Sequence, residues 1–236
     1  MYLTFDTETT GLPKNYSAPI SEVDNWPRMV QIAWQTNDKS GNLISSESYI
    51  IKPKNFTIPF NAEKIHGIST QKAQDEGKEI KDVLKKFNNE LKKNKYIIGH
   101  NINFDIKILG SEFYRSEMKT NLLEKESIDT GLISKEFCQL KGGLGGRLKM
   151  PKLIELHAIL FENDFSDAHD ARADVNATAK CFFELMKRKI FETEESKSTE
   201  IKYEEVEVKE SNFKVKKYDL NNKKENKKEN KVVEPY

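Results

Sequence analysis

The chain has 236 residues, of which 36% are hydrophobic and 33% are charged, and its formal net charge is +1. Its length allows one sizeable core, or one domain with appendages, and its longest apolar stretches fall far short of the roughly 18 residues that span a bilayer. We therefore expect no membrane partner. The near-neutral charge excludes a protein that grips long duplexes through many phosphates, but it is compatible with an enzyme that holds only a strand end through bound metal ions.

The N-terminus and the cysteines both bear on the compartment. The first ten residues contain neither the basic nor the long apolar region of a signal peptide. Only two cysteines occur, Cys138 and Cys181, which makes a disulfide scaffold or a cysteine zinc site a poor fit. These features predict a cytoplasmic protein with reduced thiols.

Composition changes near residue 192. Residues 192–236 hold 11 Lys and 12 acidic residues, against 28 Lys and Arg and 26 acidic residues before them. The end of this segment is a low-complexity charged repeat, which predicts disorder, while Val206 and Val208 alternate with charges as in a hairpin or a partner-binding strand. We predict a folded domain over residues 1–191 and a largely disordered charged linker or tail over residues 192–236.

Strand and helix patterns alternate along that domain. Short apolar or alternating segments predict strands over residues 2–7, 30–36, 47–52 and 96–98, with a turn at residues 38–42. Helical spacing predicts helices that carry residues 80–91, 106–113, 153–161 and 171–186. Three early strands followed by alternating helices and strands favour an α/β domain with a mixed sheet.

Two carboxylates stand at the end of the first predicted strand. Asp6 and Glu8 are two residues apart, so on a strand they face the same way and can reach one metal ion. The alternative is a solvated strand end that carries two surface acids.

A third acid, Asp105, follows the short strand that ends at Gly99. Asn101 or Asn103 can cap the next helix, which places Asp105 in its first turn. An acid there also favours the helix dipole without any catalytic role, and His100 can be a packed or capping residue.

The last pair, His169 and Asp174, is five residues apart and would point apart on one regular helix. Asp170 is a plausible helix cap, with Asp174 one turn into the helix and His169 in the loop before it. The pair then converges. The alternative is an acidic helix start beside an exposed histidine.

Together these segments resemble the DnaQ-like, or DEDD-type, exonuclease family. The first motif matches residues 6–12, the second matches His100-Asn101 and Phe104-Asp105, and the third matches His169 and Asp174 with four residues between them. That third motif marks the histidine-bearing subclass. The segment Ile65-His66-Gly67-Ile68 also matches a substrate-side segment of many members. The match spans about residues 1–190, and its specificity comes from the four segments occurring in order.

The resemblance implies a ribonuclease-H-like fold, with a mixed five-stranded sheet flanked by helices, and two divalent ions. Asp6, Glu8 and Asp174 would bind the ion that presents the attacking water. Asp6 would also reach the second ion, which Asp105 would support. Oxygen ligands of this kind suit Mg²⁺ or Mn²⁺. His169 would take the proton from the attacking water, a task that suits the pKa of a histidine near 6.5.

The resemblance also implies a group that seats the 3′-terminal nucleotide. Its members are Thr9, Thr10, Leu12, His66, Asn101 and Phe104. One departure is Asn61, where some relatives carry a carboxylate. This puts a contact from that position to the terminal 3′-hydroxyl in doubt.

The expected function is a 3′→5′ exonuclease that releases nucleoside 5′-monophosphates from single-stranded or frayed DNA 3′ ends, as proofreading for a replicative polymerase. Residues 24–31 and 142–149 resemble segments of exonuclease domains fused ahead of a bacterial DNA polymerase III alpha subunit, the implied partner. The glycine- and lysine-rich segment 141–149 lacks P-loop spacing and is either a flexible loop near DNA or an inert connection. An exoribonuclease, a free-standing repair nuclease and a non-catalytic nucleic-acid-binding module are the alternatives.

Overall fold

The computed structural model describes residues 1–142, 144–163 and 170–194. Within them, Met1–Thr193 form one compact unit. The expected boundary at residue 191 stays a prediction, and almost all of the expected tail, with Val206 and Val208, lies outside the described residues. No helix in the described part is long and apolar enough to cross a membrane.

The unit is built on one mixed sheet with the strand order β3-β2-β1-β4-β5. Its strands are β1 (Tyr2–Thr9), β2 (Met29–Asn37), β3 (Leu43–Ile50), β4 (Tyr96–Gly99) and β5 (Glu126–Asp129). The first three strands form antiparallel pairs, whereas β1, β4 and β5 run parallel. The expected five-stranded mixed sheet is thus confirmed.

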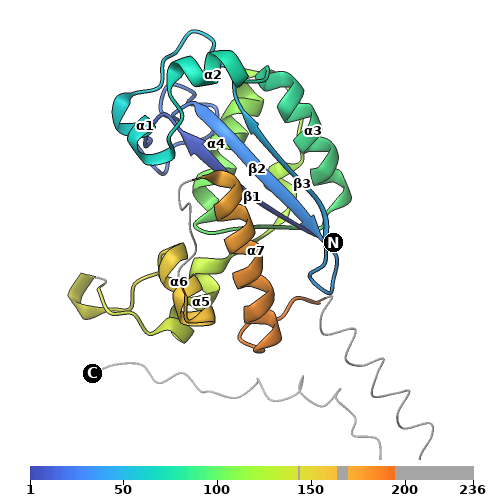
Figure 1. Cartoon of the computed structure of the whole chain (residues 1–236), viewed down its shortest axis with the longest axis vertical. Helices are drawn as coiled ribbons and strands as arrows, with labels where there is room; N and C mark the ends of the chain where they lie inside the picture. The colour runs from blue at the N-terminus through green and yellow to red at the C-terminus, as the bar shows by residue number, and fades with distance from the viewer. Residues whose placement is uncertain (143, 164–169, 195–236) are drawn as a thin grey trace, which may run out of the picture. The chain divides into compact units, whose positions relative to one another are not determined.

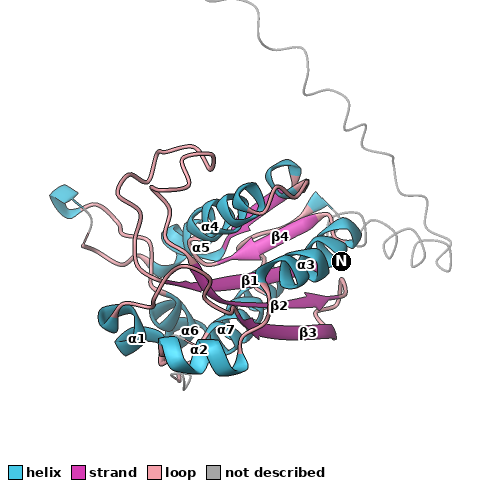
Figure 2. Cartoon of the chain, turned by 90° about the horizontal axis from the view of Figure 1, so that it is seen from above, coloured by secondary structure: helices cyan, strands magenta, loops and turns pink. Residues whose placement is uncertain are grey.

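Helices cover both faces of the sheet. The helix α7 (Ala171–Lys187) crosses in front of β1 and β2 in Figure 1, while α4 (Ile102–Arg115) lies behind them. Figure 2 shows α3 (Ile80–Lys93) beside α4. The larger core fills the space on the α3 and α4 side, around Phe5, Trp34 and Phe87. Phe182 of α7 packs against Tyr2 and Ile98 on the other side.

Most predicted elements are present, with different ends. The pattern that predicted α3 is confirmed, because Val83, Leu84, Phe87 and Leu91 are buried on one face. The predictions of α7 and of α6 (Leu153–Phe161) are confirmed as well.

The strand predicted over residues 47–52 is wrong at its ends, since β3 starts at Leu43 and stops at Ile50. The expected turn is tight because the Asp38 carboxylate accepts hydrogen bonds from the backbone of Ser40 and Asn42. Pairing with β2 therefore resumes at once, with Asn37 opposite Leu43.

Besides two 3₁₀ helices of three residues each, four α-helices and strands of the described residues were not predicted. They are α1 (Phe60–His66), α2 (Thr70–Glu76), β5 and α5 (Thr130–Cys138). Both α1 and α2 have only seven residues and few buried side chains, so they carry no clear helical period. The strand β5 has four residues and a single apolar one, Ile128.

A buried carboxylate fastens the long β1–β2 connection to α4. Glu112 is 1% exposed and accepts hydrogen bonds from Arg28 Nε and Arg115 Nη1, each at 2.9 Å. It also accepts from the backbone of Met29 at 3.1 Å. Arg28 in turn donates its backbone N–H to Thr10 Oγ1 and accepts one from the Thr10 backbone, so the segment after β1 is fixed at its base.

Candidate active site

Three carboxylates meet where β1 ends against the start of α7. Asp6 and Glu8 project from β1 toward α7, and Asp174 lies in the first turn of α7. One oxygen from each side chain lies within 4.8 Å of the others. The expectation that Asp6 and Glu8 share a face and meet Asp174 is therefore confirmed as geometry.

The start of α7 is held by two side chains. Asp170 caps the helix by accepting the backbone N–H groups of Arg172 at 2.8 Å and Ala173 at 3.3 Å. Gln31 of β2 accepts the N–H of Ala171 at 3.4 Å. The expected cap at Asp170 is confirmed. His169 lies outside the described residues, so its expected convergence with Asp174 stays a prediction.

Asp105 approaches β1 from the other side, through Thr7. Its Oδ1 accepts hydrogen bonds from Thr7 N at 3.0 Å and from Thr7 Oγ1 at 2.6 Å, and the side chain is 3% exposed. Asp105 lies in the first turn of α4, as expected. It is outside the three-carboxylate cluster but close enough to raise the pKa values of both Asp6 and Glu8.

The expected side-chain cap on α4 is wrong. Asn101 is the residue before the helix, but it has a left-handed backbone with φ of 63° and no capping side-chain hydrogen bond, and Asn103 lies inside the helix. Instead, the Asn101 N–H donates to Asp129 Oδ1 at 3.0 Å. The same oxygen accepts the N–H groups of Gly131 and Leu132, so one buried carboxylate holds the starts of α4 and α5.

Repulsion and burial dominate the electrostatics of the cluster. Burial, followed by repulsion from Asp105, Glu8 and Asp174, raises the pKa of Asp6 well above its usual value. Burial and the Asp174 charge raise the pKa of Glu8 to about 8. Burial raises the pKa of Asp105 to about 7, although the hydrogen bonds from Thr7 oppose the shift.

A divalent cation fits this donor set. The cluster offers only carboxylate oxygens, which are the ligands that Mg²⁺ and Mn²⁺ prefer. A cation there would relieve the repulsion that raises the pKa values of Asp6 and Glu8.

Beside the cluster lies a cleft of about 470 Å³ between the end of β1 and α1. Its lining includes five of the six residues expected to seat a nucleotide, which are Thr9, Thr10, Leu12, His66 and Phe104. Asn101 does not line it. Leu12 and Ile65 stand at the cleft with 74% and 59% of their surfaces exposed. Exposed apolar side chains of this size suggest contact with a flat apolar ligand.

Ile65 and Asn61, which the resemblance had also pointed to, line the cleft as well. Two further lining residues, Pro59 and Ala62, were not predicted. The sequence reasoning also missed Thr7, Gln31 and Asp129, whose hydrogen bonds orient the acids or the helices that carry them. The sequence pattern gave no signal for these roles, because each depends on a partner far along the chain.

His66 has a defined tautomer in this cleft. Its Nδ1 accepts the N–H of Ile68 at 3.1 Å, which leaves the proton on Nε2. Burial lowers the pKa of His66, a shift partly opposed by the Thr9 backbone, so the ring is neutral at pH 7. Nε2 is buried and makes no hydrogen bond of normal geometry with described residues.

Neither His100 nor the described part of residues 141–149 lines the cleft. His100 is packed, as one interpretation expected, with Nδ1 2.9 Å from Thr130 Oγ1 and Nε2 2.8 Å from the Pro151 carbonyl. The described part of residues 141–149 connects α5 to α6 and is held by a bridge between Lys141 and Leu148. None of it lines the cleft.

The sequence of the chain was compared with models of protein families and with curated proteins. A family model described as Exonuclease, of the RNase T type, matches residues 3–182. No curated protein has a sequence that matches the chain.

Solved structures share the fold. E. coli exonuclease I in complex with a dT13 oligonucleotide has a TM-score of 0.64 and 23% identity, with 80% of this chain and 41% of that chain covered. The zinc-bound E. coli exonuclease I complex with single-stranded DNA has a TM-score of 0.60 and 23% identity, with 79% and 40% covered. A product-bound structure of exonuclease I has a TM-score of 0.62 and 21% identity, with 80% and 44% covered. The chain spans about two fifths of the length of these structures. The likeness confirms the ribonuclease-H-like fold.

In EDTA, we expect the protein to be more stable at about pH 5.5 than at about pH 8.5 because of the carboxylate cluster. The pKa values of Glu8 (about 8) and Asp105 (about 7) exceed the roughly 4 of an unfolded chain. Their contribution to stability is thus fully present below about pH 4 and is lost as the pH rises through 7 to 8. Thermal melts at both pH values measure the difference.

Millimolar Mg²⁺ or Mn²⁺ should raise the melting temperature more at the higher pH, where the acids are ionised. Glu8→Gln should weaken the pH dependence in EDTA, whereas Asp75→Asn, at an exposed acid on α2, should leave it unchanged. An unaltered pH dependence in Glu8→Gln would contradict the electrostatic account.

Proposed function

The chain belongs to the RNase T/DnaQ-like (DEDD) exonuclease family, and we propose that it hydrolyses phosphodiester bonds one nucleotide at a time from the 3′ ends of DNA. The observation that carries this proposal is the meeting of Asp6, Glu8 and Asp174 at the edge of a cleft that can hold one terminal nucleotide. Exonucleases of this family use divalent metal ions, and we propose two Mg²⁺ or Mn²⁺ ions here.

The four acids divide between the two proposed ions. Asp6, Glu8 and Asp174 would hold one ion, and Asp105, oriented by its two hydrogen bonds from Thr7, would support the second. Divalent ions in such a site lower the pKa of water and stabilise the charge of a leaving 3′-oxygen. Without them, the ionised acids would repel the anionic phosphodiester.

The cleft residues position the terminal nucleotide. Leu12, Ile65 and Phe104 offer apolar surface for a base or sugar, a contact that tolerates every base because each has a flat face. His66 lines the cleft as a neutral ring and can pack against the bound nucleotide. Asn61 can contact the sugar as a neutral amide, where a carboxylate would add another negative charge.

A single-stranded end suits this site better than a paired one. A base-paired 3′ nucleotide must first be separated from its partner, and this costs a few kcal/mol, least at a mismatch. Structures of E. coli exonuclease I with dT13 support a DNA strand as the substrate. RNA trimming is the second candidate, since no feature of the cleft yet selects against a 2′-hydroxyl.

Proofreading is the finer proposal, with the alpha subunit of a bacterial DNA polymerase III as the partner. Its support is the resemblance of residues 24–31 and 142–149 to segments of exonuclease domains fused to such polymerases. In the structure, residues 28 and 29 of the first segment are fixed to Glu112 at the base of the cleft wall. The slight positive charge of residues 1–191 also favours delivery of the primer end by a partner.

Asp6→Asn should abolish metal-dependent release of nucleoside 5′-monophosphates from a labelled single strand. The variant removes one negative charge from the cluster, so in EDTA at pH 8 we expect its melting temperature to be at least that of the wild type. Asp75→Asn, at an exposed acid on α2 that lines neither the cleft nor any other described cavity, is the matched control and should keep full activity. Full activity of Asp6→Asn, or of the wild type in EDTA, would refute the metal assignment.

His169→Ala should lower the rate by roughly 10²–10⁴ while leaving metal affinity nearly intact, because we propose that His169 accepts a proton rather than binding the ion. The wild-type rate should rise with pH through the histidine pKa and then level off. Titration calorimetry separates the two roles, and a variant that loses metal binding would make His169 a ligand.

Mismatched primer–templates should be degraded faster than matched ones, because their 3′ ends fray more readily. The comparison measures hydrolysis of both substrates with and without the polymerase alpha subunit, and a matched RNA strand tests the sugar preference. If mismatches gain no advantage and the polymerase adds nothing, the proofreading proposal fails while the nuclease proposal stands.

A further inference from the structure

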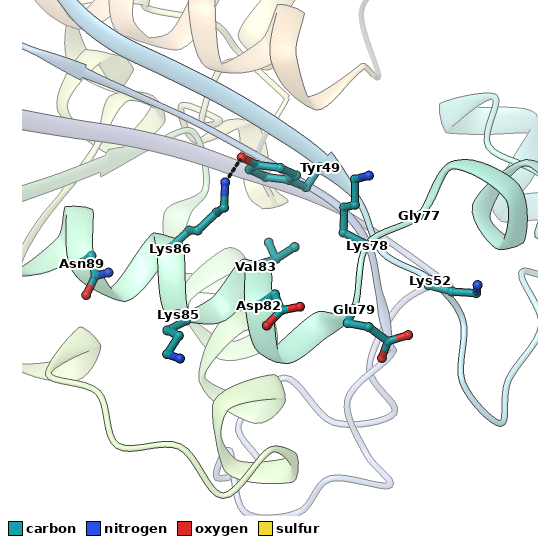
Figure 3. A pocket seen from close by; sticks show the side chains of 10 residues that line it. All are labelled: Tyr49, Lys52, Gly77, Lys78, Glu79, Asp82, Val83, Lys85, Lys86 and Asn89. Carbon is teal, nitrogen blue, oxygen red and sulfur yellow. Dashed lines mark hydrogen bonds between the residues drawn. The ribbon is translucent and has the colours of Figure 1, made fainter.

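A second cavity lies at the edge of the sheet, between the end of β3 and the first turns of α3 (Figure 3). Its volume is about 670 Å³, and none of its lining residues also lines the cleft. Val83, which is 1% exposed, and Tyr49 provide its apolar part. The function proposed above does not use this cavity.

Lysines dominate the lining of this cavity. The four are Lys52, Lys78, Lys85 and Lys86, against the two acids Glu79 and Asp82. Lys86 is engaged, since its Nζ donates to Tyr49 Oη at 2.8 Å and lies 3.7 Å from Glu47 Oε2. No ion pair within the described residues involves the other three lysines. Four lysines against two acids leave the lining of the cavity with a formal net charge of +2.

Backbone contacts hold two of these lysines side by side. Lys52 N donates to the Lys78 carbonyl at 2.9 Å, and Lys78 N donates to the Ile50 carbonyl at 2.8 Å. The approach is close enough to require glycine before Lys78, because a Cβ on Gly77 would lie 2.6 Å from Lys52 N. Figure 3 shows the Lys52 and Lys78 side chains on one side of the cavity and Lys85 on the other.

The register of the sheet relates this cavity to the carboxylates. Glu8 lies opposite Gln31, and Gln31 lies opposite Ile50, so the end of β3 is two strands away from the end of β1. Two strand spacings and two further residues to Lys52 amount to about 10–15 Å between backbones. A stacked strand rises about 3.4 Å per nucleotide, so this distance corresponds to roughly three to four nucleotides.

We propose that the Lys52–Lys78–Lys85 cavity binds a phosphate of the substrate strand about four nucleotides upstream of the 3′ end held in the cleft. That the occupant is a substrate strand rests on the proposed function. Lys52, Lys78 and Lys85 form no ion pair within the described residues, and lysine binds phosphate as a point charge, so Lys52 and Lys78 on one side or Lys85 on the other can contact a phosphate oxygen. The lysine stems and Tyr49 give the sugar an apolar wall.

The test compares two triple variants with the same change of charge. Lys52→Gln/Lys78→Gln/Lys85→Gln removes the cavity charges, while Lys81→Gln/Lys92→Gln/Lys119→Gln removes exposed lysines outside the cavity. Each is assayed with Mg²⁺ on a dinucleotide and on a single strand of about twelve nucleotides, over a range of salt concentrations. A parallel arm measures inhibition by a nucleoside 5′-monophosphate.

The cavity variant should lose about tenfold in kcat/KM on the long strand, through KM, and should show a salt dependence weaker by a slope of about 1–2. Its turnover of the dinucleotide, which cannot reach the cavity, should match the wild type. The control variant should change neither. A double substitution, Lys52→Gln/Lys78→Gln, serves if the triple variant does not fold.

Equal kinetics of both variants on the long strand would overturn the proposal. Loss of monophosphate inhibition with an unchanged long-strand rate would also overturn it, because the occupant would then be the free nucleotide. Failure of the proposed function looks different, since the wild type would then be inactive on both substrates. Binding of the long strand in EDTA by the two variants would still test the cavity.

Discussion

Mutual repulsion among half-buried carboxylates is the constraint on which the rest of this structure depends. With oxygens 4.8 Å apart, two ionised acids repel each other by about 3 kcal/mol at an effective dielectric constant of ~20. The fold must keep Asp6, Glu8 and Asp174 together against this repulsion when no cation is bound. Part of the answer is the backbone of β1, because Asp6 pairs with Ala33 and Glu8 pairs with Gln31 of β2. The other neighbour of β1, β4, pairs with it only over Tyr2–Thr4.

The same logic applies to the supports around the cluster. Gln31 and Asp170 fix the first turn of α7, and Thr7 fixes Asp105 through two hydrogen bonds. Asp129 holds the start of α4 with a single oxygen shared among three N–H groups. These partners make the site rigid before any ion binds, which favours a fixed coordination geometry. The cleft wall is tied in the same way, because Glu112 holds Arg28 and Arg28 holds Thr10.

The sequence alone predicts those features of the site that are set by residues close together in the chain. Residues two apart on one strand share a face, so Asp6 and Glu8 could be paired from spacing alone. The helical period and an acidic cap placed Asp174 on α7. The sequence does not predict a local conformation that depends on a residue far along the chain. The left-handed Asn101 depends on Asp129, 28 residues away, and the order of the cleft wall depends on Glu112, 84 residues from Arg28. Short elements such as α1 and β5 escaped because they are too brief to show a period.

The two kinds of charge on this domain are separated along one edge of the sheet, and this separation has a consequence for substrate polarity. The acids stand at the end of β1, and the lysine-lined cavity lies two strands away at the end of β3. A strand end bearing its phosphate would be drawn to the acids only when cations neutralise them, whereas the lysines attract phosphates at any metal concentration. Under the proposed binding of a strand at the cavity, a metal-free protein would therefore hold the strand there, with its end away from the carboxylates. Cation binding would then make the cleft attractive as well, so that the strand spans both sites and its terminal bond reaches the acids. The nearly neutral net charge of the domain would then be the sum of a negative region at the carboxylates and a positive region at the lysines. The strand would contact both regions only when metal ions neutralise the carboxylates.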